Sequence, residues 1–558
     1  MSSDISLGLS GILAARQAIT TIGQNIANSA TPGYARREVR LTSRSWSVAD
    51  ARNAGGGVTV DHVDRVRDTF LAEQLRSHKS GLESSETRSR YLAEVEALIQ
   101  EPGTEGIGAA LDRFFNQWQS VAAQPENNSE RNSLLLTAAD LANQITTLRQ
   151  GLTNLRASIQ GEVTDIVREV NQLTASIVNV NNLSAQSAGS DGGVGLGDER
   201  DRAMAELARL IGARDISPND ATATVLVGGS LLVEGTSQVQ LLPPTDFDSP
   251  LRIGTGSDSG PIEAPGGSLA ALITLNRETI PSYINRLDEL ASGLIRSVNA
   301  LHSAGKVSSG PFTDMTAALA ASDTDGDGDA GNDLLAAAFD LPIEVGSFRI
   351  NVTELASGAV TNHDIAINPT TQSLNDVASE LNALGNISAT ITNGRLRIQT
   401  ASGYGFDFAG AQSAGLPTGL GLNAFFGGSD ASSIQVAERL IGNPELIATG
   451  ETTDAGDGAV AAAISETRNA NLPDLQATGP ETWRNFITGI GADSASARDL
   501  ATAQDGMVSL LNQQDQAVSG VSLDEEGARL MQFQEMFTAC ARYLSTISRL
   551  NDLLIQYL

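Results

Sequence analysis

The two ends of the chain carry the same apolar spacing, and this spacing constrains the fold more than any other feature. Apolar residues recur there at three- and four-residue steps, which is typical of a helix that packs along a partner helix. The N-terminal set is Ile5, Leu9, Ile12, Ile19 and Ile26. The C-terminal set is Leu523, Leu530, Phe533, Phe537, Cys540, Leu544, Ile547, Leu554 and Leu558. Because the second pattern reaches the last residue, where ordinary domains fray, we expect that helix to be held by another helix or another subunit.

Packing within one chain and packing between copies both satisfy these two patterns, and the sequence leaves both open. The patterns contain little that a catalytic mechanism could use. They favour an assembly protein over an enzyme.

Composition limits the possible partners. The 558 residues carry a net charge of -30, so the chain repels nucleic acid and anionic membrane surfaces, and neither is expected as a partner. A hydrophobic content of 41% excludes wholesale disorder, and the length allows several domains. Cys540 is the only cysteine, which excludes an intrachain disulfide and a cysteine-based metal site.

The N-terminal segment lacks the sequence features of a cleaved signal peptide. It lacks a basic stretch, and Asp4, Arg16 and Gln17 interrupt its apolar positions. We therefore expect no cleaved signal peptide. We also expect no membrane span, because no stretch reaches the roughly 18 consecutive apolar residues that a span requires.

The order of helical and extended patterns predicts an α+β multidomain fold. Both termini form a discontinuous helical coiled-coil core, and β-rich insertion domains are nested between them. The longest helix is expected from Leu134 to Leu183. The predicted segments are 1–66 for the N-terminal helix and extended part of the core, 67–212 for a long helical bundle, 213–266 for a small β-rich insertion, 267–304 for a helical return, 305–450 for an outer β-rich insertion, 451–520 for a second helical return and 521–558 for the C-terminal amphipathic helix.

Local motifs mark turns and helix ends. Pro32 followed by Gly33 suits the centre of a type II turn, and Asn28 can cap the helix before it. Ser522 is placed to cap the last helix, whose first turn is acidic. Thr279 is a candidate cap for a helix that begins near Pro281.

No residue set predicts catalysis, a cofactor or a metal. Residues 323–328 match the first half of an EF-hand loop, but Leu334 stands where the loop needs a bidentate glutamate, so a solvated acidic linker is the simpler interpretation. The four histidines are scattered, and His302 is interpreted as a helix-end residue that tolerates a cation. The acidic run 198–201 is interpreted as the favourable start of a helix.

Several of these motifs together resemble a known family. Residues 25–34, with Asn25, Asn28, Thr31, Pro32, Gly33 and Tyr34, are similar to the N-terminal signature of flagellar axial proteins of the rod, hook and hook-associated group. Residues 520–526 followed by Phe533 resemble the C-terminal signature of that group. Residues 198–201 and 267–305 resemble segments of its hook-associated members.

The resemblance implies a structural adaptor that links the flagellar hook to the filament. It implies self-assembly into a ring or tube through the terminal helices, with the insertions facing outward. The implied partners are the hook protein, hook-associated protein 3 and an export chaperone bound to the C-terminal helix. The implied location is extracellular, in the flagellum, after type III export as an unfolded chain.

A second hypothesis comes from the insertions. In it, the chain is a secreted calcium-dependent adhesin or peptidoglycan-lytic protein, and the helices serve as a stalk. Metal binding or hydrolysis by residues 305–449 would support that alternative.

Overall fold

The computed structural model describes residues 2–31, 33–43, 57–99, 106–186, 193–217, 222–245, 251–253, 261–410 and 412–557. The chain divides into two compact units. Unit 1 comprises residues 1–91, 158–277 and 495–558, and unit 2 comprises residues 92–157 and 278–494. Each unit is thus assembled from segments that lie far apart in the sequence. The predicted mixed α+β multidomain class is confirmed.

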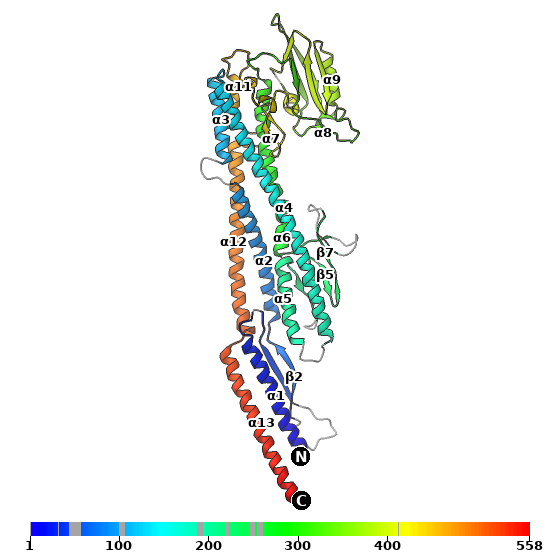
Figure 1. The fold of residues 1–558 in the computed structure, drawn as a ribbon, viewed down its shortest axis with the longest axis vertical. Coiled ribbons are helices and arrows are strands. Elements are labelled where there is room, and N and C mark those ends of the chain that lie inside the picture. The colour runs from blue at the N-terminus through cyan, green and yellow to red at the C-terminus, as the bar shows by residue number, and fades with distance from the viewer. Residues whose placement is uncertain are drawn as a thin grey trace. The chain divides into compact units, whose positions relative to one another are not determined.

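Helices dominate the described residues (Figure 1). Their bounds are α1 Ser2–Ala27, α2 Thr69–Ile99, α3 Ile107–Ala123, α4 Asn128–Gln186, α5 Gly193–Ile211, α6 Gly267–Thr274, the π-helix η2 Leu275–Thr279, α7 Ile280–Ala304, α8 Leu335–Ala338, α9 Leu374–Asn382, α10 Leu416–Leu420, the 3-10 helices η3 Glu438–Leu440 and η4 Pro444–Leu446, α11 Ala459–Glu466, the 3-10 helix η5 Thr467–Asn469, α12 Gly479–Ser519 and α13 Leu523–Tyr557. The long helix expected from Leu134 to Leu183 is confirmed as α4.

The strands form small antiparallel sheets. Unit 1 holds β1 Arg37–Ser43 with β2 Val58–Arg65, the sheet β3-β4-β5-β6 and the sheet β7-β8-β9; their remaining bounds are β3 Arg214–Asp215, β4 Val225–Val227, β5 Ser230–Glu234, β6 Ser237–Gln238, β7 Leu241–Leu242, β8 Leu251–Ile253 and β9 Pro261–Ile262. Unit 2 holds β12-β11-β15, β10-β14-β13 and β16-β17, with bounds β10 Asp314–Thr316, β11 Gly346–Glu354, β12 Val360–Ile367, β13 Ile387–Thr392, β14 Arg395–Thr400, β15 Tyr404–Asp407, β16 Phe426–Gly427 and β17 Gln435–Val436.

The outer β-rich part of unit 2 has its own apolar core. Strand β11 pairs with β12 and with β15, and its alternate residues Phe348, Ile350 and Val352 are buried. Helix α9 starts with a capping box at Ser373 and contributes further core residues. The alternation of buried and exposed positions is what a sheet with one covered face requires.

His302 lies at the centre of a second buried cluster in unit 2. Its Nδ1–H donates to the Asn423 carbonyl at 2.7 Å, and its Nε2 accepts from the Ala448 N–H at 3.0 Å. The rings of Trp118 and Phe425 pack edge-on against the imidazole. Burial, and then the nearby cation of Arg439, lower the pKa of His302 to about 3.

His302 does lie in the last turn of α7, but its interpretation as a residue that tolerates a cation is wrong. Its side chain is fully buried and neutral, and the last turn of α7 is closed by the Gly305 N–H bonding to the His302 carbonyl. Burial in apolar surroundings keeps the His302 imidazole neutral. A rule based only on position at a helix end does not take these surroundings into account.

Arg131 is buried in unit 2 on carbonyl oxygens. Its guanidinium donates to the carbonyls of Pro125, Pro444 and Ile447 and to the Thr449 hydroxyl. This side chain ties the start of α4 to residues more than 300 positions later. Its planar set of N–H donors suits several acceptors at once, which a lysine does not match.

The predicted cap at Thr279 is also wrong. Thr279 has helical backbone angles and makes no side-chain capping bond. The chain runs from α6 through the π-helical turn η2 into α7, so no new helix starts there. A π-turn absorbs one extra residue, and Pro281, which has no backbone N–H to donate, lies in the first turn of α7, where that donor is not needed.

Candidate functional site: the paired terminal helices

The helices α1 and α13 run side by side and antiparallel in unit 1 (Figure 1). The buried residues of α1, which pack against α13 and the strands β1 and β2, are mostly small and follow steps of one, three and four residues. They are Gly8, Gly11, Ala14, Ala15, Ala18, Thr21, Ile22 and Asn25. Small side chains allow two helix backbones to come close.

The glycines of α1 show how close this approach is. A Cβ on Gly8 would lie 2.7 Å from Leu544 Cγ, and a Cβ on Gly11 would lie 2.6 Å from Cys540 Sγ. Both distances are shorter than van der Waals contact. Glycine is thus required here for space, although it weakens the helix by about 1 kcal/mol relative to alanine.

Replacing Gly8 with valine is expected to separate the two helices. The added methyl groups overpack the contact with Leu544, which typically costs about 1–3 kcal/mol. Hydrogen exchange of the α13 amides measures the change. Gly23→Val in the same helix is the matched control, because no atom lies within 4 Å of a Cβ there. Equal exchange in the two variants would contradict the close packing.

Of the large residues predicted for the assembly interface, Leu544 lies in this contact against Gly8, whereas several others are exposed. On α1, Ile5 and Leu9 are 44% and 48% exposed, and the other three are partly buried, namely Ile12, Ile19 and Ile26. On α13, Leu523 and Phe537 are exposed, and four are partly buried, namely Leu530, Phe533, Leu544 and Ile547. The side chain of Leu554 lies outside the described residues.

Further exposed apolar side chains on the same pair were not singled out from the sequence. They are Leu7 and Leu13 on α1 and Met531, Leu550, Leu553 and Ile555 on α13. They lie off the heptad positions, so the spacing rule passed over them. Apolar residues on more than one face of each helix were the available signal.

By length and composition, the segment Asp4–Ala27 is apolar enough to cross a membrane, with a mean hydropathy of 1.3. The segment reaches this mean hydropathy because alanine and isoleucine outweigh its polar residues, but it contains no run of 18 consecutive apolar residues, so the expectation of no membrane span stays a prediction. In the structure, 39% of its most apolar window is buried. Its buried side faces α13.

Asn25 joins three separate segments of unit 1. Its side chain is fully buried. The amide nitrogen donates to the Arg37 carbonyl and to Glu526 Oε2, each at 2.9 Å. The amide oxygen accepts from the Tyr34 hydroxyl at 2.8 Å and from the Arg37 N–H at 3.0 Å. One side chain thereby connects α1 to β1 and to the first turn of α13.

The rest of the predicted signature forms the turn between α1 and β1. The Tyr34 N–H bonds to the Thr31 carbonyl, and Gly33 has a φ of 76°, as expected for a type II turn. Asn28 contacts the Gln24 carbonyl and the Thr31 hydroxyl. Burial raises the pKa of Tyr34, which keeps its hydroxyl a donor to Asn25. Pro32 lies outside the described residues.

The sequence did not reveal the partners of Glu526, which accepts a hydrogen bond from Asn25, or those of the acidic residues 198–201 in α5. Helix α5 begins at Gly193, so residues 198–201 are not its first turn, and that interpretation is wrong. Asp198 contacts Arg37 and Arg65 at 2.9 and 2.8 Å. Asp201 contacts Arg65 and Arg67 at 2.6 and 2.8 Å.

The charge of Asp201 is held by these contacts. Burial alone would raise the pKa of Asp201, but the guanidinium groups of Arg65 and Arg67 outweigh it and bring the pKa below its usual value. The cluster fastens the β1–β2 hairpin and the start of α2 onto α5. Only the fold brings these residues together, because they are more than 130 positions apart.

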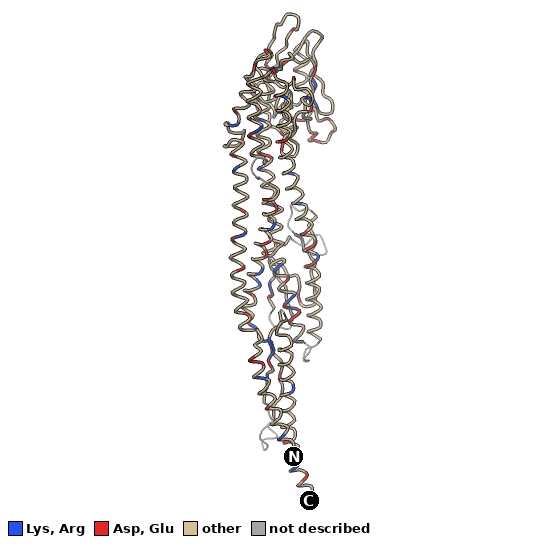
Figure 2. Tube along the Cα trace, turned by 60° about the vertical axis from the view of Figure 1, so that its left-hand side comes forward, with Lys and Arg blue, Asp and Glu red and all other residues tan. Residues whose placement is uncertain are grey.

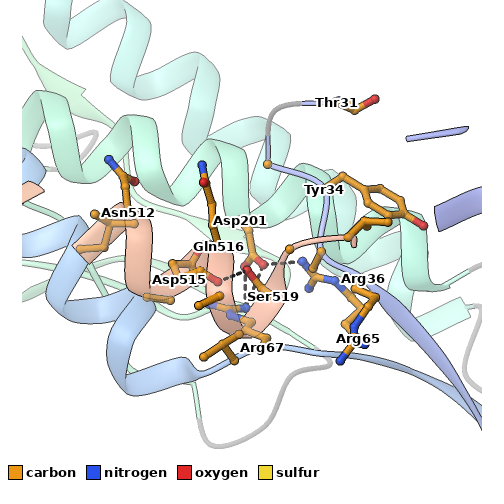
Figure 3. Close-up of a pocket in the computed structure, with 18 of the residues that line it drawn as sticks. Thr31, Tyr34, Arg36, Arg65, Arg67, Asp201, Asn512, Asp515, Gln516 and Ser519 are labelled. Carbon is orange, nitrogen blue, oxygen red and sulfur yellow. Dashed lines mark hydrogen bonds and ion pairs between the residues drawn. The ribbon is translucent and has the colours of Figure 1, made fainter. Parts of the chain in front are cut away.

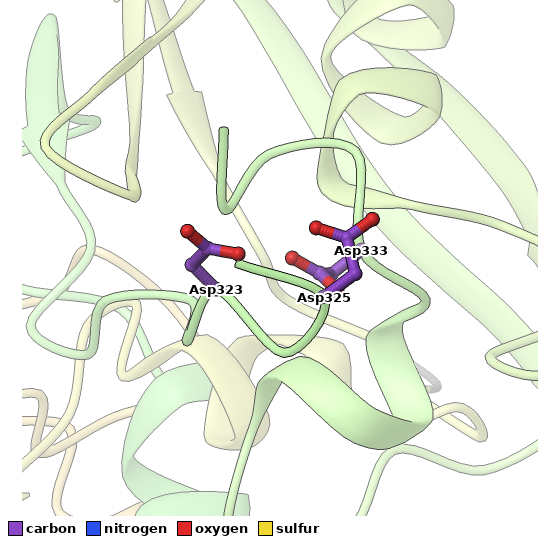
Figure 4. Close-up of side chains that lie close together, drawn as sticks. All are labelled: Asp323, Asp325 and Asp333. Atoms are coloured by element: carbon purple, nitrogen blue, oxygen red, sulfur yellow. The ribbon is translucent and has the colours of Figure 1, made fainter. Parts of the chain in front are cut away.

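The acidic loop of unit 2 gathers three carboxylates (Figure 4). Oxygens of Asp323, Asp325 and Asp333 lie within 4.8 Å of one another. Asp323 already accepts from the N–H groups of Gly326 and Gly328, and the backbone N–H of Thr324 donates to Asp333. These carboxylates therefore close turns within their own loop.

Comparisons with known proteins agree with this geometry. The model of the flagellar hook-associated protein FlgK helical domain matches residues 92–314. Flagellar hook-associated protein 1 of Escherichia coli (strain K12) is 25% identical over 586 residues, covering 100% of both chains. The chain is similar to flagellar hook-associated protein 1 over its full length. The resemblance inferred from the sequence motifs is thus confirmed.

Other relatives show how far the similarity extends. Flagellar hook-associated protein 1 of Bacillus subtilis (strain 168) is 24% identical over 560 residues, covering 97% of this chain and 96% of its own. The structure of the flagellar hook junction protein FlgK from Burkholderia pseudomallei matches with a TM-score of 0.53 at 17% identity. It covers 80% of this chain and 100% of its own, which shows a shared fold. The family consists of structural proteins of the flagellum.

Proposed function

We propose that this chain is the structural junction protein that links the flagellar hook to the filament. It assembles into a ring or tube through α1 and α13 of neighbouring copies. The single observation that supports this mechanism is the terminal pair itself. Small residues fill its internal contact, and large apolar side chains remain on its outside.

The exposed apolar side chains supply the free energy for assembly. Burying one leucine, isoleucine or phenylalanine fully contributes about 1.5–3 kcal/mol. Ordering the helix ends and side chains costs conformational entropy, which offsets part of this gain. An apolar surface of this kind on a single copy is also a hazard for aggregation, which an export chaperone on α13 would prevent.

The remaining features fit export and assembly outside the cell. Cys540 is the only cysteine, so the chain passes through a narrow channel without a disulfide to reduce. The hook protein and hook-associated protein 3 adjoin the assembled ring, and the β-rich segments 213–266 and 305–450 face outward. The seven segments predicted from the sequence are kept as proposed domain boundaries. No catalytic step is needed for this role.

Removing exposed apolar side chains from α13 is expected to block incorporation without unfolding the chain. Met531, Leu550 and Ile555 are 62%, 51% and 72% exposed, so serine at all three positions removes little contact within one copy. Electron microscopy of cells that carry this triple variant in place of the natural gene should show hooks without filaments. Deleting α13 entirely should have the same effect.

A matched triple variant controls for general damage to α13. Gln534, Arg549 and Asp552 are exposed on the same helix, and serine at all three leaves the net charge unchanged. These cells should keep their filaments. Normal filaments in the apolar variant would count against assembly through α13.

A further inference from the structure

A cavity of about 910 Å³ lies in unit 1 where the terminal segments meet the other helices (Figure 3). We call it the arginine pocket. Its wall is formed by residues 29–31 and 33–36, the end of β2, the start of α2, part of α5, the last turns of α12 and the start of α13. All of these segments belong to unit 1.

The charge of the arginine pocket is opposite to that of the whole chain. Its six basic side chains are Arg36, Arg65, Arg67, Arg76, Lys79 and Arg202, a sixth of the 36 lysines and arginines in a protein of net charge -30. Three carboxylates line it, from Asp201, Asp515 and Glu525. Figure 2 shows Lys and Arg positions gathered where α12 ends and the terminal pair begins.

The carboxylates of unit 1 do not form ion pairs with all six of these basic side chains. Arg65 and Arg67 share Asp201, and Arg36 reaches Glu525 only at 3.4 Å. Among the described residues, Lys79 makes no ion pair. Arg202 also lacks a carboxylate partner there, and its Nε donates only to a backbone carbonyl. Two cations therefore remain available to an outside carboxylate.

The size and lining of the arginine pocket fit a peptide. About 910 Å³ is at the upper end of the range for ligand sites, far larger than one inorganic anion needs. Asn512 and Gln516 on α12 add amide donors and acceptors that a peptide backbone can use. A nucleic acid would have to approach a strongly acidic protein, which electrostatics oppose.

We infer that the arginine pocket receives an acidic segment of a neighbouring copy of this chain. The inference rests on the proposed function, because a ring sets many identical copies side by side. Each copy carries 66 acidic residues, so the assembly itself supplies the carboxylates. Lys79 and Arg202 hold the incoming carboxylates, and this contact fixes neighbouring copies at one relative position.

Photo-crosslinking in assembled flagella tests this contact. A benzophenone amino acid replaces Gln516 in the full chain. This variant is expressed in cells of the source organism from which the natural gene for this chain has been deleted. Irradiation should give a covalent dimer of this chain, and mass spectrometry should place the link in a segment that contains Asp or Glu. Cross-linking to a different protein, or no cross-linked product, would overturn the inference.

Charge reversal supplies the second arm of the test. In the same background, Lys79→Glu with Arg202→Glu should reduce the dimer at least tenfold. Arg40→Glu with Arg168→Glu makes the same change in net charge at exposed sites of unit 1 and should leave the dimer unchanged. An equal dimer yield in both variants would overturn the inference. Lys79→Gln with Arg202→Gln, which introduces no repulsion, should show a smaller loss in the same direction.

Filament counts in the same cells distinguish a failure of the proposed junction role from a failure of the inference about the arginine pocket. If the chain without substitutions does not restore filaments, the proposed function fails, and the inference fails with it. If filaments are restored but Gln516 gives no dimer, the junction role stands and only the arginine pocket is wrongly assigned.

Discussion

Replacing Asn25 with leucine is expected to release α1 from α13 and to leave hooks without filaments. The leucine has nearly the same size but leaves Glu526, Tyr34 and the Arg37 backbone without their buried partner. Removing one partner from buried polar groups costs about 1–3 kcal/mol for each group, and more where a charge is involved. We expect a loss of about 3–5 kcal/mol for the terminal pair.

Hydrogen exchange of the α1 and α13 amides measures this loss in the purified chain. A loss of about 3 kcal/mol corresponds to exchange that is roughly a hundredfold faster through local opening. Asn28→Leu is the control, because Asn28 is a nearby asparagine whose amide nitrogen contacts only the Gln24 carbonyl. If both variants exchange alike, Asn25 does not hold the terminal pair together.

Replacing His302 with leucine is expected to destabilise unit 2 by about 2–5 kcal/mol at neutral pH. The change leaves the Asn423 carbonyl and the Ala448 N–H buried without partners, at about 1–3 kcal/mol each. Urea unfolding followed by tryptophan fluorescence measures it, since Trp118 and Trp483 are both buried in unit 2. His363→Gln, on strand β12 of the same unit, should change stability little.

The lowered pKa of His302 also predicts how the stability of unit 2 depends on pH. The folded chain holds the pKa of His302 near 3, whereas the unfolded chain has the ordinary value of 6.5. As the pH falls below about 6.5, the unfolded state binds a proton that the folded state does not. Stability should then fall by up to about 1.4 kcal/mol per pH unit, until the pH nears 3.

The variant isolates this contribution from that of other groups. His302→Leu should show a shallower loss of stability between pH 6.5 and pH 4 than the unsubstituted chain. If the two slopes are the same, His302 is not held neutral in the folded chain.

Sequence reasoning was most successful where local pattern decides the structure. The long helix expected from Leu134 to Leu183 lies within α4, and the turn expected at Pro32 and Gly33 has the positive φ at Gly33 that a type II turn requires. Ser522 caps α13 through its hydroxyl, as expected. In each of these elements, periodicity or capping chemistry within a few residues is sufficient.

Sequence reasoning was less successful where the structure depends on distant residues. The small face of α1 was passed over because large apolar residues dominate a heptad pattern, whereas α13 comes close at the small residues Gly8 and Gly11. Glu526 looked like a residue that only favours the start of a helix, and its contact with Asn25 spans 501 positions. The neutrality of His302 depends on the rings of Trp118 and Phe425, the Asn423 carbonyl and the Ala448 N–H, all of them distant in the sequence.

A high-resolution map of the native hook–filament junction tests the central claim most directly. The account predicts that Leu9 and Leu13 of α1 and Leu550 and Ile555 of α13, which are exposed in a single copy, are covered by the helices of adjacent copies. A map in which both terminal helices contact only each other, with these side chains in solvent, would contradict it.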